Sequence, residues 1–138
     1  MSAETRSTDE APAGSRVRHR LIALAVAGIA AAATWLIGNA VGAELTVNQN
    51  GVTEITLVGA LVSTLMAGLA GWGLLALLER FTARARKAWT YCASAVLLLS
   101  LLPTVFADAT TGTRLTLTAM HLVVGAVLIP AYRRSARS

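Results

Sequence analysis

The chain has 138 residues, of which 55% are hydrophobic and only 14% are charged, and its mean hydropathy is +0.62. A soluble domain carries about 25% charged residues, so this composition excludes an ordinary soluble fold and favours an integral membrane protein. The net charge of +5 does not indicate nucleic-acid binding, because the basic residues lie in short blocks beside apolar runs and not along a patch with stacking aromatic rings. Cys92 is the only cysteine, so it has no partner for an intramolecular disulfide.

The chain begins with a polar segment, residues 1–15, which we expect to be a disordered cytoplasmic tail because it has little apolar surface to bury. A basic block at 16–20 precedes the first uncharged run, 21–43. An alternative is that this run belongs to a cleaved signal peptide, since residues 41–43 suit a signal peptidase site. The run is longer than the usual apolar core of about 7–15 residues, so a retained spanning helix is the preferred interpretation. Cleavage would leave three spans.

Three further uncharged runs follow, at 55–78, 88–107 and 115–132. Each has the length of a membrane-spanning helix, which needs about 17–25 residues. A polar loop with an Asn50-Gly51 turn signal joins the first run to the second, and a basic stretch, 79–87, joins the second to the third. The predicted transmembrane domain covers 16–134, and a basic cytoplasmic tail, 135–138, follows it.

The distribution of basic residues predicts the orientation of the spans. If both termini and the 79–87 stretch share one side, that side holds every Lys and Arg except Arg114. By the positive-inside rule both termini are then cytoplasmic. Short connections make sequential spans antiparallel, so the predicted fold is all-α, with four transmembrane helices in an up-down-up-down antiparallel bundle. Trp89, Tyr91 and Tyr132 lie beside basic blocks, where we expect their rings at the membrane interface.

Two strips of small residues, each spaced by four, predict close helix packing. One strip lies in the first run and the other in the second, and we expect the first two helices to pack through them. The strips are Ala30, Thr34, Gly38 and Gly42 in the first run, and Gly59, Ser63, Ala67 and Gly71 in the second.

His121 is the main candidate functional residue, because it lies near the middle of the fourth run, where an ionisable side chain is costly. Pro103 lacks an N–H, so we expect it to kink the third helix and to leave the carbonyl of Leu99 free. That carbonyl and three hydroxyls lie at a depth similar to that of the histidine. We therefore predict a polar layer in which His121 hydrogen-bonds one of these groups, either as structural support or as part of a functional site. The layer consists of His121, Leu99, Ser63, Thr64 and Ser100.

No catalytic residue is predicted, because the sequence lacks hydrolase, metalloprotease and nucleotide-binding motifs and has no paired carboxylates inside a run. His121 has no second metal-ligand residue at its depth, so we expect neither a metal nor a cofactor. The preferred function class is a non-catalytic bundle, acting as an accessory subunit, an assembly factor or a homo-oligomer. The alternative is a small transporter or channel component in which His121 and the hydroxyls line a path for a proton or a small solute. The expected partners are the lipid bilayer, a second copy or another membrane protein, and not nucleic acid.

Several short segments resemble a family of small four-helix integral membrane proteins of unknown function, found mainly in actinobacteria. These are the basic stretch that leads into an Ala-rich first span, the segment Ser100-Leu101-Leu102-Pro103, and His121-Leu122-Val123-Val124 with Pro130. The resemblance covers roughly Arg16 to Arg134. It implies the four-helix architecture and a place in the bacterial plasma membrane, and it implies no activity.

Overall fold

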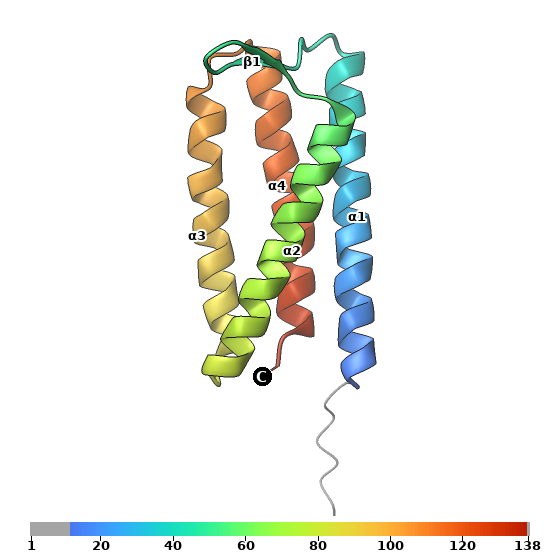
Figure 1. Ribbon diagram of the computed structural model, residues 1–138, viewed down its shortest axis with the longest axis vertical. Helices are drawn as coiled ribbons and strands as arrows, with labels where there is room; N and C mark the ends of the chain where they lie inside the picture. The colour runs from blue at the N-terminus through green and yellow to red at the C-terminus, as the bar shows by residue number, and fades with distance from the viewer. Residues whose placement is uncertain (1–11, 138) are drawn as a thin grey trace, which may run out of the picture.

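The computed structural model describes residues 12–137, which form four long helices and one short hairpin (Figure 1). The helices are α1 (Ala13–Ala40), α2 (Leu57–Phe81), α3 (Ala85–Phe106) and α4 (Thr111–Ser135). Each is long and apolar enough to cross a membrane. The prediction of four helices, each long and apolar enough to span a membrane, is thereby confirmed for this part of the chain.

α1 is longer than its uncharged run at the end that carries the basic block. It begins at Ala13, directly after Pro12, and ends at Ala40. Charged arginines do not stop a helix, since Arg is a good helix former. Residues 13–15 of the predicted disordered tail are therefore helical, whereas residues 1–11 lie outside the described part.

Threonine residues mark the start of two other helices. Thr56 Oγ1 accepts a hydrogen bond from Gly59 N at 3.0 Å before α2, and Thr110 Oγ1 accepts one from Thr113 N at 3.3 Å before α4. A threonine in this position satisfies one of the free N–H groups of the first helical turn. α3 continues through Pro103 to Phe106.

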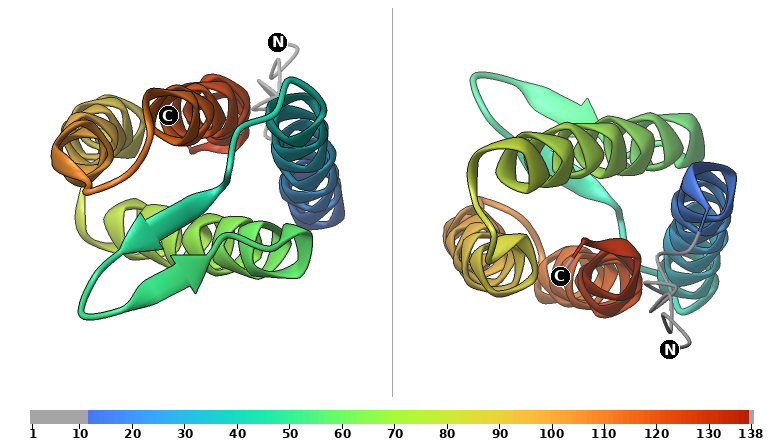
Figure 2. Two further views of the ribbon diagram at one scale, coloured as in Figure 1. Left: turned by 90° about the horizontal axis from the view of Figure 1, so that it is seen from above. Right: turned by 90° about the horizontal axis from the view of Figure 1, so that it is seen from below.

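The loop predicted at 44–54 contains an antiparallel hairpin of β1 (Thr46–Asn48) and β2 (Val52–Glu54). Asn50 and Gly51 have positive φ angles of 61° and 139°, so the turn signal lies where the chain reverses. Asn48 N donates to Asp108 O at 3.0 Å, and this bond ties the hairpin to the loop between α3 and α4. The hairpin thus covers one end of the bundle (Figure 2).

The four helices form a ring in the order α1, α2, α3, α4 when viewed along the bundle (Figure 2). α4 packs most extensively, against both α1 and α3, whereas α2 packs mainly against α1 and only loosely against α3 and α4. Many large apolar side chains point outward; Ile29 and Leu98, for example, are 70% and 66% exposed. An apolar outer surface of this kind suits contact with lipid chains.

The small-residue strips do not pair as predicted. α1 packs against a neighbouring row on α2 that includes Ala60 and Gly68, because Ala60 joins the buried cluster around Ala31 and a Cβ at Gly68 would overlap Leu24. Gly38 of the first strip faces α4, where a Cβ would lie 2.5 Å from Thr116 Cγ2. Both rows on α2 are spaced by four and hold small residues, so spacing alone does not select between them.

Candidate functional site

A cavity of about 750 Å³ lies between α2, α3 and α4 and is bordered by the β1–β2 hairpin. Its α2 side is formed by Gly59, Ser63, Ala67 and Gly71, the strip that was expected to contact α1. These side chains are too small to reach α3 and α4 across the gap. Gly59, Ser63 and Ala67 are exposed, so the cavity is open to its surroundings.

Four of the five residues predicted to form a polar layer line this cavity: His121, Ser63, Thr64 and Ser100. Leu99 does not line it, and its side chain is 63% exposed. Four of the predicted residues thus border one cavity.

The predicted hydrogen bond from His121 to another helix is wrong. His121 Nδ1 donates to Leu117 O of its own helix at 2.7 Å. The Ser100 hydroxyl also bonds within its own helix, since Ser100 Oγ donates to Leu97 O at 2.7 Å. A side chain on a helix always has the carbonyl of the preceding turn within reach, whereas a bond across the bundle requires the helices to approach closely, and α2 packs only loosely here.

The polar side chains share one level of the bundle. On α3 and α4, Thr104 Oγ1 lies 3.3 Å from Thr118 Oγ1, and Leu97 lies against Gly125. Ser100 and His121 fall between these two contacts along α3 and α4 and therefore lie at a similar level of the bundle. On α2, Ser63 reaches the same level, since it lies about 12 Å along the helix from Gly71, which is near the floor of the cavity.

Trp89 lines the cavity at the end away from the hairpin, and Tyr132 packs against Trp89. Their ring centroids are 5.5 Å apart, and they are only 4% and 0% exposed. Trp89 Nε1 donates to Ile129 O at 3.1 Å, and Tyr132 Oη donates to Gly68 O at 2.9 Å. The expectation of rings at the membrane interface is therefore wrong for Trp89 and Tyr132, which pack inside the bundle because the small Gly68 and Gly71 leave room for them. Tyr91, by contrast, is 76% exposed.

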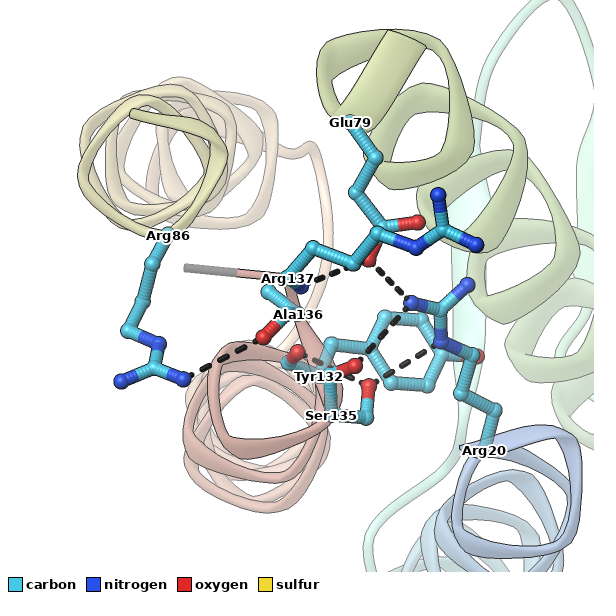
Figure 3. A network of polar contacts seen from close by, with 7 residues as sticks. All are labelled: Arg20, Glu79, Arg86, Tyr132, Ser135, Ala136 and Arg137. Carbon is cyan, nitrogen blue, oxygen red and sulfur yellow. Dashed lines mark hydrogen bonds and ion pairs between the residues drawn. The ribbon is translucent and has the colours of Figure 1, made fainter. Parts of the chain in front are cut away.

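A buried polar network lies beyond these rings, at the end where the chain terminates (Figure 3). Arg20 Nη2 forms an ion pair with Glu79 Oε1 at 2.6 Å, and the two side chains are only 7% and 12% exposed. Arg20 Nε donates to Ser135 Oγ at 3.0 Å, and its guanidinium lies 5.9 Å from the centre of the Trp72 ring. Arg137 N donates to the same Glu79 oxygen at 3.0 Å. The network joins α1, α2 and the end of α4.

Sequence reasoning missed this network, because it treated the charged residues as solvated flanks of the spans. Glu79 is the only acid in the basic stretch 79–87. A single acid among basic residues is a signal from which an ion pair could have been predicted. The network also reaches α3, since Arg86 Nη2 donates to Ala136 O at 3.2 Å.

Among residues 12–137, no comparable network lies at the opposite end of the bundle. Arg114, which lies at that end, donates from Nε to Ala107 O at 2.9 Å. Within residues 12–137, no group of three His, Cys, Asp or Glu side chains is arranged to hold a metal ion. Glu44, Glu54 and Asp108 are exposed.

The family model of DUF6069, a family of unknown function, matches residues 11–138. The chain belongs to this family. The match confirms the expected membership in a family of unknown function, and DUF6069 carries no activity that could be transferred. Neither the search of curated proteins nor that of solved structures found a match.

The chemical capacity of this DUF6069 protein therefore follows from its geometry. The cavity lining contains no Asp, Glu, Lys or Arg, so the cavity suits neutral molecules. Its volume falls within the roughly 300–1,000 Å³ typical of small-molecule sites. The site is suited to binding an apolar compound and to orienting it by a few polar contacts.

Proposed function

We propose that this protein is a four-span protein of the plasma membrane, without catalytic activity, that binds an apolar small molecule. The observation that carries the proposal is the open cavity of about 750 Å³ between α2, α3 and α4. The other function class considered from the sequence was passage of a proton or a solute. Binding is favoured over passage, because the end of the cavity away from the hairpin is lined by the buried, hydrogen-bonded Trp89 ring, against which Tyr132 packs.

The proposed orientation places both termini and the α2–α3 turn in the cytoplasm and the hairpin outside. It is supported by the excess of basic residues at the end of the bundle that holds this turn. Val52 on the hairpin is 76% exposed, and Arg84 on the turn is also exposed, so both positions suit cysteine labelling in a Cys92→Ser background. A membrane-impermeant maleimide should label Val52→Cys in intact cells and Arg84→Cys only after permeabilisation. The reverse pattern, or labelling of both in intact cells, would contradict this orientation.

α1 is proposed to be retained in the mature protein. The support is that α1 contributes Arg20 to the ion pair with Glu79 and packs extensively against α4. Cleavage after residue 43 would leave the Glu79 carboxylate without this partner. The intact mass of the purified protein distinguishes the two forms.

Binding can be tested through fluorescence of Trp89, which lines the cavity. In a Trp35→Phe, Trp72→Phe protein, a 1-bromoalkane should quench the remaining tryptophan in a saturable manner, because bromine quenches at contact. Ala67→Phe should reduce the quenching by filling the cavity. Leu69→Phe is the matched control on the same helix, since Leu69 is 52% exposed and does not line the cavity. Quenching that does not saturate, or that Ala67→Phe leaves unchanged, would refute the proposed binding function.

A second candidate function is assembly, in which a helix of another copy or of a different membrane protein occupies the open side of the cavity. The exposed small residues Gly59, Ser63 and Ala67 favour it, because they permit close approach of a helix. The same variants test it. Ala67→Phe would then reduce the mass of the complex measured by native mass spectrometry, and Leu69→Phe would not.

A further inference from the structure

We propose that the cavity binds a long-chain alcohol, whose hydroxyl donates a hydrogen bond to His121 Nε2 and whose chain extends to Trp89. The inference names the class of ligand for the cavity and so rests on the proposed binding function. It follows from three features of the lining: the hydrogen-bonding state of His121, the change from polar to apolar residues along the cavity, and the lack of charge.

His121 offers an acceptor to the cavity. Its Nδ1 lies 2.7 Å from Leu117 O, and a carbonyl oxygen only accepts, so Nδ1 carries the proton. In the neutral imidazole the other nitrogen, Nε2, is then an acceptor. Within residues 12–137 Nε2 has no hydrogen-bond partner. Every buried side-chain nitrogen or oxygen in that range has a hydrogen-bond partner, so Nε2 is not buried. Nε2 is therefore accessible, and His121 lines the cavity.

The neighbouring hydroxyls also present acceptors. Ser100 and Thr64 use their protons in bonds to Leu97 O and Ala60 O, at 2.7 Å and 2.8 Å. The lone pairs of these oxygens remain, so the layer is rich in acceptors and poor in donors. A head group that donates a hydrogen bond fits such a layer better than a carboxylate, which only accepts.

The lining becomes apolar from the polar layer toward the floor of the cavity. Below His121 it includes Ala93, Leu97, Leu128 and Ile129, whereas the polar residues Gln49 and Thr53 lie on the hairpin at the other end. The apolar part extends over about 12 Å, since eight residues of α4 separate His121 from Ile129, whose carbonyl accepts from Trp89 Nε1. This arrangement fits a chain that points to the floor and a head group at the layer.

The head group is neutral. An ammonium group would also donate hydrogen bonds, but no Asp or Glu lines the cavity to balance its charge. An uncompensated charge at this depth of a membrane is costly. A hydroxyl is neutral and also donates a hydrogen bond. It donates to His121 Nε2 and can accept from Ser63 Oγ.

The test uses the single-tryptophan protein in phosphatidylcholine nanodiscs, with quenching in the Ala67→Phe variant subtracted as the background from probe dissolved in lipid. Three brominated probes of equal chain length are compared: an ω-bromo-1-alkanol, a 1-bromoalkane and an ω-bromo-carboxylic acid. One hydrogen bond predicts about tenfold tighter binding of the alcohol than of the alkane. His121→Leu should remove this difference between the alcohol and the alkane. Thermal melting followed by circular dichroism verifies that each variant is folded.

The possible outcomes separate the ligand class from the binding function. Saturable quenching by the alkane, with no advantage for the alcohol, would overturn the inference while the proposed binding function stands. The acid is tested at alkaline pH, where its carboxylate has no proton to donate. Tighter binding of this carboxylate than of the alcohol would overturn the argument from acceptors. If the alcohol still binds more tightly than the alkane in His121→Leu, His121 does not bind the hydroxyl and the inference is overturned. If no probe quenches in a saturable manner, the binding function itself fails.

Discussion

Replacing Glu79 by alanine tests how strongly the buried ion pair holds the helix ends together. The carboxylate lies 2.6 Å from Arg20 Nη2, and both side chains are largely buried. Removing one partner of a buried pair costs about 3–5 kcal/mol, because the other charge stays desolvated without compensation. We expect about 3 kcal/mol, the lower end of this range, because Ser135 Oγ still accepts from Arg20 Nε and Trp72 still lies against the guanidinium.

The free energy of unfolding can be measured by SDS titration of the detergent-solubilised protein, followed by far-UV circular dichroism. Arg80→Ala is the matched control, since Arg80 is the neighbouring residue on α2 and is exposed; its effect should stay within about 0.5 kcal/mol. Arg20→Ala should cost about as much as Glu79→Ala. The double variant should cost less than the sum of the two, with a coupling of about 2 kcal/mol.

A loss of less than about 1 kcal/mol in Glu79→Ala, the size typical of an exposed pair, would refute this reasoning. Additive effects in the double variant would do the same, because they would mean that the two side chains do not interact in the folded protein.

Two further predictions concern helix packing and the hairpin. Gly38→Ala should destabilise the protein by about 1–3 kcal/mol, since its Cβ would lie 2.5 Å from Thr116 Cγ2 and a β-branched side chain has little freedom to rotate away. Gly73→Ala, where nothing lies within 4 Å, should be neutral or stabilising by up to about 1 kcal/mol; equal losses in both variants would contradict a close α1–α4 contact. Thr113→Val should speed hydrogen exchange at the Leu45 amide, which donates to Thr113 Oγ1 at 3.1 Å. Unchanged exchange there would mean that other contacts hold this end of the hairpin.

The polar layer shows how far a candidate site can be predicted from sequence. The depths of Ser63, Ser100 and His121 were predictable, because depth along a helix depends only on residue number and rise. The partner of His121 was not predictable. It depends on the distance between α2 and α4, and the Leu117 carbonyl of the same helix turned out to be the acceptor.

The aromatic residues near the chain end show a second limit. Trp89 and Tyr132 lie beside basic residues in sequence, which is typical of rings at a membrane interface. Sequence position sets their depth but not the direction in which the rings point around the helix axis. Gly68 and Gly71 leave space inside the bundle, and the two rings fill it.

The sequence by itself determined four long helices that are apolar enough to span a membrane, and the position of each polar side chain along its helix, because these depend on local composition and on helix geometry. Only the tertiary structure decided which helix faces meet. Small residues occupy two adjacent rows on α2, and the larger side chains of the other helices determine that one row packs against α1 while the other lines the cavity. The pairing of Arg20 with Glu79, 59 residues apart in the chain, likewise arises only when α1 and α2 come together.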